Sequence, residues 1–109
     1  MAKYLLIESR DPFENNIAAR QYDLAVNLVK EGNQVTLFLV QNGVLPARPG
    51  NLSSLLTNAA KAGVEVLADD FSLRERGIRG EEINRAIRES SIDNLVDMLV
   101  QDNTKAIWH

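Results

Sequence analysis

Residues 34–40 read QVTLFLV, and this short, almost continuously apolar run decides the fold. Such a run is typical of a strand that is covered on both faces, as in a parallel sheet between helices. Residues 3–8, KYLLIE, form a second run of the same kind. Between the two runs, apolar residues recur at three- and four-residue spacings over 18–29, which predicts an amphipathic helix. A strand, a helix and a strand within about 40 residues predict a right-handed parallel crossover unit.

The helix of this unit carries signals for its start and its end. Asp11 can cap free amides, Pro12 suits a first turn, and Glu14 stands at the capping-box spacing from Asp11. Gly32 is a suitable left-handed residue to stop the helix. We therefore predict that the helix begins close to Asp11 and ends before Gly32.

The same alternation continues through the middle of the chain. A second helix is predicted to open at Asn51 or Ser53 and to end at Gly63, and a strand follows over 64–68. A short turn or helix over 73–76 comes next, ended by a glycine. The segment 41–50, with two glycines and two prolines, is predicted to be a loop-rich insertion.

The last third of the chain leaves one element open. Residues 83–89 fit either a helix or a fourth short strand. Residues 90–93 have a capping-box spacing before an apolar helical stripe, and a final strand is predicted over 104–108. We therefore expect one domain over 1–109, an α/β fold in the form of a three-layer α/β/α sandwich with a mainly parallel five-stranded sheet.

The composition excludes several classes of function. With 45% hydrophobic and 25% charged residues and a net charge of −3, the 109-residue chain has no general attraction to nucleic acid or anionic membranes. It has no targeting segment and no apolar run of the roughly 20 residues that span a membrane, so we expect a cytoplasmic protein. The absence of cysteine excludes disulfides, thiolate metal sites and thiol chemistry.

The carboxyl ends of parallel strands meet at one edge of a sheet, which is where ligands bind in this class of fold. Polar or small residues that follow the predicted strand ends are the ligand-binding candidates: Ser9, Asn42, Gly43, Asp69, Asp70, Ser72 and Arg76. Since loops are polar in any protein, a functional pocket and an ordinary polar edge both remain open.

Catalytic and metal sites have little support in the sequence. Asp69 and Asp70 are neighbours in an extended segment and point to opposite sides, which argues against an acid–base pair or a metal site. His109, the one histidine, is expected at a frayed end or a subunit contact. Ser90 or Ser91 is explained by helix capping, and no phosphate-binding glycine motif occurs. We predict no catalytic residue, no metal and no cofactor.

The stretch 71–88 indicates a contact surface. Over 74–88, five arginines alternate with glutamates and no aromatic stacking residue occurs, so a salt-bridged or subunit-contact surface is favoured over a nucleic-acid site. Arg76, before Gly77, is the arginine that can instead turn toward the strand ends. Apolar residues in the same stretch predict a homo-oligomer, with these interface candidates: Phe71, Leu73, Arg74 and Ile78.

Several segments together resemble the DsrE/DsrF/TusD-like family of small sulfur-relay proteins. They are the first strand followed by Asp11-Pro12, the VTLFL strand followed by Asn42-Gly43-Val44, the AGVEV segment at 62–66, and SLRERGI at 72–78, close to a Ser-Leu-x-x-Arg-Gly-Ile pattern. The resemblance covers nearly the whole chain. It implies a three-layer domain that assembles as a trimer or hexamer, alone or with related subunits.

This chain lacks one residue that the resemblance leads us to expect. The sulfur carriers hold a persulfide on a cysteine just after the third strand, and counting back from Gly77 places that cysteine at or beside Asp69. A carboxylate cannot carry a sulfane sulfur. Two functions stay open: a non-catalytic oligomeric subunit or binding module, or an enzyme or small-molecule- or anion-binding protein that uses the strand-end cleft.

Overall fold

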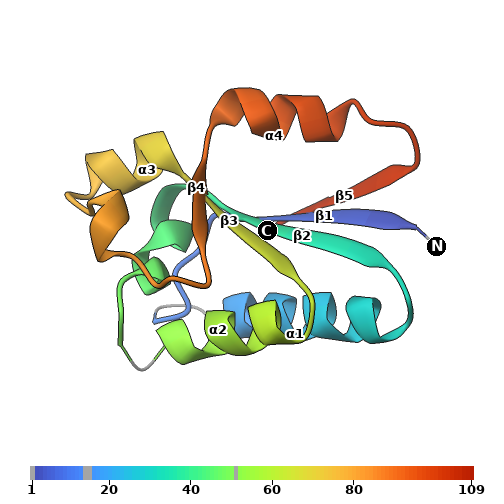
Figure 1. Cartoon of the computed structure of the whole chain (residues 1–109), viewed down its shortest axis with the longest axis horizontal. Helices are drawn as coiled ribbons and strands as arrows, with labels where there is room; N and C mark the ends of the chain where they lie inside the picture. Colours follow the sequence, from blue (N-terminus) through green and yellow to red (C-terminus); the bar gives the residue numbers. More distant parts are fainter. Residues whose placement is uncertain (1, 14–15, 51) are drawn as a thin grey trace.

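Five strands form one fully parallel sheet in the spatial order β4-β3-β2-β1-β5 (Figure 1). The computed structural model describes residues 2–13, 16–50 and 52–109. The strands are β1 (Lys3–Glu8), β2 (Gln34–Leu39), β3 (Glu65–Asp69), β4 (Arg88–Ser90) and β5 (Thr104–Trp108). The predicted α/β fold with a five-stranded parallel sheet is confirmed.

The segment that the sequence left open between helix and strand ends in a strand. Residues 83–87 form a bend and a turn, and β4 then pairs with the end of β3, where Asp69 lies opposite Ser90. Ile87 is buried in the core just before β4. The apolar spacing over 83–87 therefore reflects packing of single residues and not a helical stripe.

Two helices cover one face of the sheet. Helices α1 (Asn16–Lys30) and α2 (Ser53–Lys61) lie below the strands in Figure 1 and pack against the larger part of the core. Alternate strand residues such as Leu6 and Leu37 point toward this face, as the two-residue period of a strand requires. None of the described helices has the length and apolar character needed to cross a membrane.

Helix α4 (Ile92–Leu99) lies on the opposite face and completes the third layer (Figure 1). It buries Leu95 against a smaller cluster that includes Leu5, Ile7 and Phe38. The short helix α3 (Asp70–Glu75) follows β3 directly and stands at the carboxyl ends of the strands. A 3₁₀ turn, η2 (Gly80–Glu82), joins α3 to the segment before β4.

The helices end where the sequence predicts, with a left-handed glycine shortly after each of the first two. Gly32 after α1 and Gly63 after α2 have φ of +92° and +112°, which most side chains avoid. As described, α1 starts at Asn16, and Asp11 Oδ1 instead accepts a hydrogen bond from the Phe13 amide at 3.0 Å. Two predicted start residues lie outside the described residues: Glu14 and Asn51.

The start of α4 is displaced by one residue from the predicted capping box. Ser91 is the N-cap, and its Oγ accepts a hydrogen bond from the Asn94 amide at 3.2 Å. Ser90 ends β4, and its Oγ accepts a bond from the Asn94 side chain at 2.7 Å. Both serines thus accept hydrogen bonds that order the start of this helix.

Most of the segment predicted as a loop-rich insertion is a 3₁₀ helix. Residues Gln41–Ala47 form the 3₁₀ helix η1, and Val44, Pro46 and Ala47 are buried. Gly43 packs against the backbone carbonyl of Glu8 at the end of β1, where an added Cβ would collide. Apolar burial therefore orders a segment whose glycine and proline content predicted a loop.

Candidate functional site: a cleft at the strand ends

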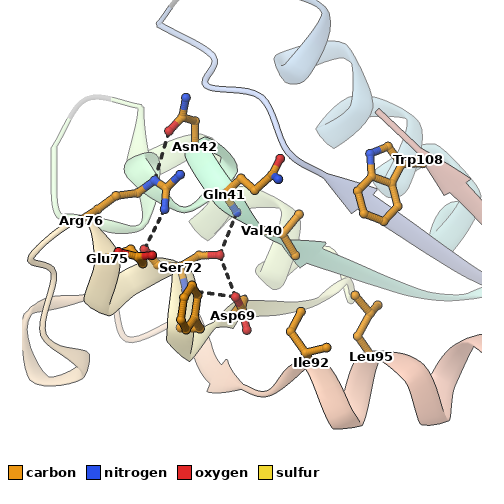
Figure 2. Close-up of a pocket in the computed structure, with 11 residues that line it drawn as sticks. Val40, Gln41, Asn42, Asp69, Ser72, Glu75, Arg76, Ile92, Leu95 and Trp108 are labelled. Atoms are coloured by element: carbon orange, nitrogen blue, oxygen red, sulfur yellow. Dashed lines mark hydrogen bonds between the residues drawn. The ribbon is translucent and has the colours of Figure 1, made fainter.

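A cleft of about 680 Å³ opens at the carboxyl ends of β2 and β3, beside α4 (Figure 2). The chain diverges here, because the segments after β1 and β2 lead to helices on one face while β4 leads to α4 on the other. The volume is within the range of roughly 300–1,000 Å³ typical of small-molecule sites. We therefore take this cleft as the candidate site.

Asp69 ends β3 and occupies the inner side of the cleft. The residue is 2% exposed, and its Oδ2 accepts two hydrogen bonds from Ser72, one from the amide at 3.0 Å and one from Oγ at 2.7 Å. The first of these caps α3. Its other oxygen, Oδ1, is buried and has no hydrogen-bond partner among the described residues. The carboxylate is thus held in one orientation with one acceptor atom unused.

Ser72 joins α3 to the end of β2. While its Oγ donates to Asp69, the same oxygen accepts a hydrogen bond from the Gln41 amide at 2.8 Å. Gln41 has a left-handed φ of +50°, which is uncommon for a residue with a side chain. The bond to Ser72 therefore helps to fix a turn that would otherwise be unfavourable.

Arg76 lies at the outer end of the cleft, and its guanidinium is held by two hydrogen bonds. Nε donates to Asn42 Oδ1 at 3.1 Å, and Nη1 donates to the Ser72 carbonyl at 3.1 Å (Figure 2). Within the described part of the chain, none of the ion pairs includes Arg76. The cleft thus contains a positioned cation without a carboxylate partner.

The rest of the cleft wall is largely apolar. Figure 2 shows Trp108 of β5 across the cleft from Ser72 and Arg76, and Ile92 and Leu95 of α4 along the lower side. Leu95 is buried, but Trp108 is 63% exposed, and Ile92 and Phe71 are also exposed. An apolar wall with a few fixed polar groups is the usual make-up of a small-molecule site.

The structure brings together four of the seven ligand-binding candidates: Asn42, Asp69, Ser72 and Arg76. The other three lie elsewhere. Ser9 donates from Oγ to the His109 carbonyl at 2.9 Å, Gly43 packs on β1, and Asp70 faces Arg74 at 3.6 Å. Asp70 thus points away from Asp69, which agrees with the argument against a carboxylate pair.

Sequence reasoning missed the apolar half of the cleft. Ile92, Leu95 and Trp108 were placed in a helix and a strand, with no role at the site. One signal was available: α4 and the residue after it carry more apolar residues than a helix of eight residues can bury against one sheet face. Gln41 and Glu75 also line the cleft and were not among the candidates.

Two of the four interface candidates belong to the core of the single chain. Leu73 and Ile78 are buried with the residues under α1 and α2, so the prediction of a subunit contact at these two positions is wrong. Both side chains pack against the core of their own chain, so neither is exposed for contact with a second subunit. Phe71 is exposed, and Arg74 forms its ion pair with Asp70 at the surface.

A second polar cluster lies on the α1 face of the same edge. Glu8 is 1% exposed, and its two carboxylate oxygens lie 2.8 and 2.9 Å from His109 Nδ1. The His109 amide also donates to the Ile7 carbonyl at 2.9 Å, which extends the pairing of β5 with β1. The expectation of a frayed end is therefore wrong, because a buried carboxylate fixes His109, whereas a subunit contact at this end stays a prediction.

Tyr22 of α1 adds a neutral phenol beside this cluster. Burial raises the pKa of Tyr22, and the carboxylates of Glu8 and Asp11 raise it further. Its hydroxyl has no hydrogen-bond partner in the ranges that the structure describes. Across the same ranges, no group of three or more His, Asp or Glu side chains is arranged to hold a metal ion.

Comparisons with known proteins establish the fold. No family model and no curated protein sequence matches the chain. The crystal structure of the YchN protein from E. coli is similar with a TM-score of 0.82 over 98% of this chain and 100% of YchN, at 18% identity. MTH1491 from Methanobacterium thermoautotrophicum, a protein of unknown function, is similar with a TM-score of 0.74 over 98% of this chain and 97% of its own, at 17% identity. The chain thus has the DsrE-like fold.

Proposed function

We propose that this chain is a non-catalytic subunit of the DsrE-like fold, a binding module of a homo-oligomer that carries no persulfide sulfur itself. The proposal rests on the identity of residue 69, which is an aspartate, and on the hydrogen bonds that its side chain forms. At or beside the position where the family resemblance expects the sulfur-carrying cysteine, the buried carboxylate of Asp69 accepts two hydrogen bonds from Ser72 and caps α3. The 109 residues contain no thiol that could take over the step.

Intact mass spectrometry under non-reducing conditions tests the absence of sulfur transfer. The purified protein is incubated with glutathione persulfide, and a peptide with one cysteine in the same mixture serves as the positive control. We expect sulfur on the peptide and an unchanged mass for the protein. A stable gain of one sulfur atom on the protein would contradict the proposal.

The surface of α4 supports the oligomeric part of the proposal. Ile92, Val96, Leu99 and Val100 are all exposed, and we call them the α4 stripe; Val100 reaches 74%. A stripe of apolar side chains fits a second copy of itself, because it needs no complementary charge across a symmetric contact. The polar neighbours Asp93 and Asp97 can form the rim of such a contact.

Light scattering coupled to size exclusion tests the assembly. We expect three or six times the chain mass of 12.1 kDa at micromolar concentration. Val96→Lys should shift the protein toward the monomer, whereas Asp23→Lys, at an exposed position of α1 on the other face of the sheet, should leave the mass unchanged. A wild-type mass of 12.1 kDa, or equal effects of the two lysines, would contradict an interface on the α4 stripe. Phe71→Asp tests whether the contact extends to α3.

Binding of a small molecule in the strand-end cleft is a second candidate function. The guanidinium of Arg76 favours it, since Arg76 forms no ion pair within the described residues and lines a cleft of suitable size. Native mass spectrometry of the protein as purified tests this function independently of any chosen ligand. A bound compound that is lost on denaturation is expected, and its absence from protein purified under several growth conditions would count against the candidate.

A further inference from the structure

Strand β5 lies at one edge of the sheet, and within the described chain it pairs with β1 alone. Strands of parallel sheets are normally buried on both faces, and β1, β2 and β3 each have four buried residues, whereas none of the five residues of β5 is buried. We infer that β5 pairs antiparallel with β5 of a second copy, which joins the two five-stranded sheets into one. This inference rests on the homo-oligomer proposed above and names the strand through which two copies meet.

The outer side of β5 carries backbone groups that a further strand can use. His109, directly after β5, bonds to the β1 side with both of its backbone groups: its amide donates to the Ile7 carbonyl at 2.9 Å, and its carbonyl accepts from the Ser9 amide at 2.8 Å. Because these groups alternate from side to side along a strand, the even-numbered residues of β5 face the other way. The residues that direct their N–H and C=O groups to the open edge are therefore Thr104, Ala106 and Trp108.

One antiparallel register pairs all of these outer residues. When Ala106 lies opposite Ala106 of the second copy, Thr104 lies opposite Trp108. In an antiparallel ladder, opposite residues that exchange both N–H···O bonds recur at every second position, which is the spacing of the outer residues. A displacement by two residues leaves one outer residue of each strand unpaired. A displacement by one sets outer groups against groups that already bond to β1.

The side chains of β5 suit this register. On the α4 face, Trp108 is 63% exposed and lies across from Thr104 of the second copy, beside the small side chain of Ala106, which leaves room for the indole. On the other face, Lys105 lies opposite Ile107, so that like charges do not meet. The strand is therefore complementary to itself, as a symmetric contact between two copies requires.

The charged residue on this edge does not guard it. An edge-strand lysine usually discourages pairing, but the Lys105 ammonium lies over the ring of Tyr4 in its own chain, 5.6 Å from the ring centre. The opposite edge of the sheet is a poorer partner for β5, since β4 has three residues, of which Arg88 and Glu89 are exposed and charged. A β5–β4 contact would also continue head to tail from copy to copy, whereas a β5–β5 contact closes after two copies.

Hydrogen exchange of the ¹⁵N-labelled protein tests the pairing at single amides. The Ile107 amide faces β1 and should exchange slowly with or without a second copy. The amides of Ala106 and Trp108 face the open edge, so they are protected only where another strand covers it. We expect these two amides to exchange as slowly as that of Ile107. Fast exchange of both beside a slow Ile107 would overturn the inference.

Single-cysteine variants report the register, because the chain contains no cysteine of its own. Ala106→Cys places two thiols at opposite positions with Cα atoms about 5.5 Å apart, a separation that a disulfide spans. Lys105→Cys, the matched control at the neighbouring exposed position, lies diagonal to its own copy at about 7–8 Å, where a disulfide needs backbone movement. After mild oxidation, a linked dimer is expected for Ala106→Cys and not for Lys105→Cys. Linkage of both, or of neither, would overturn the inference.

Ala106→Pro separates the β5 contact from the rest of the assembly. The substitution removes an outward amide that β1 does not use, so circular dichroism should stay unchanged while the mass from light scattering falls at least about twofold. An oligomer of unchanged mass would overturn the β5 contact and leave the homo-oligomer standing. A wild-type mass of 12.1 kDa would overturn both, so the two failures are distinguishable.

Discussion

The two faces of the sheet differ in how completely helices cover them. On one face α1 and α2 bury a large cluster that includes Leu37, Leu56 and Val66. On the other face, α4 is the described helix that packs on the strands, and it buries Leu95 while its stripe stays exposed. We conclude that the α1–α2 face supplies most of the stability, and that the α4 face keeps apolar surface available for contacts with other molecules.

The largest expected effect compares the same substitution on the two faces. Leu56 of α2 is 0% exposed and Leu99 of α4 is 42% exposed. Leu56→Ala should lower the free energy of unfolding by about 3 kcal/mol, because it removes buried atoms and leaves a cavity, and Leu99→Ala should lower it by less than about 1 kcal/mol. Urea denaturation of both variants measures the difference. Equal losses would show that α4 is buried as tightly as α2, for example by a partner subunit.

His109→Ala tests the polar cluster at the edge of the α1–α2 face. The substitution leaves the buried Glu8 carboxylate with the Arg10 amide, 3.0 Å from Oε2, as its remaining donor in the described structure. We expect a loss of about 2 kcal/mol, below the 3–5 kcal/mol of a fully buried pair because the imidazole is partly exposed. Urea denaturation at pH 7 measures it, and His109→Gln, which keeps a donor, should recover part of the loss. A loss under about 0.5 kcal/mol would show that this pair does not hold β5 in place.

Because Tyr22 is buried on the same face, we predict that its phenol makes the free energy of unfolding depend on pH. Since the pKa of Tyr22 is raised in the folded protein above its ordinary value of 10.0, the unfolded chain releases this proton first as the pH rises. The contribution of Tyr22 to the free energy of unfolding is fully present below pH 10.0. Above that pH the free energy of unfolding should fall by up to about 1.4 kcal/mol per pH unit. Tyr22→Phe should abolish this part of the alkaline loss while retaining stability at pH 7. Identical alkaline profiles of the two proteins would contradict the assignment.

The smallest effect is expected at the start of α4. Ser91→Ala removes the hydroxyl that accepts from the Asn94 amide, and loss of such a cap costs about 1 kcal/mol. Hydrogen exchange should locate the effect in the first turn of α4 and leave α1 and α2 unchanged. Faster exchange throughout the sheet would mean that the two faces unfold together and are not separate in stability.

The sequence by itself determined four of the five described strands and the class of the fold. Strands over 3–8, 34–40, 64–68 and 104–108 follow from apolar runs, and these match β1, β2, β3 and β5 to within one residue at each end. Glycines marked the helix ends because a left-handed residue is a local requirement. The strand-end rule also indicated the edge that holds the cleft, since it depends only on the direction of parallel strands.

Tertiary structure alone decided which of the candidate residues meet. Leu73 and Ile78 are apolar and close in sequence to Phe71, yet packing against the sheet buries the first two and leaves the third exposed. Likewise, Trp108 faces Asp69 and Arg76 because α4 carries the chain back across the sheet to β5. Periodicity tells which face of its own element a residue occupies. It does not tell which distant element covers that face, because this depends on contacts between residues far apart in the chain.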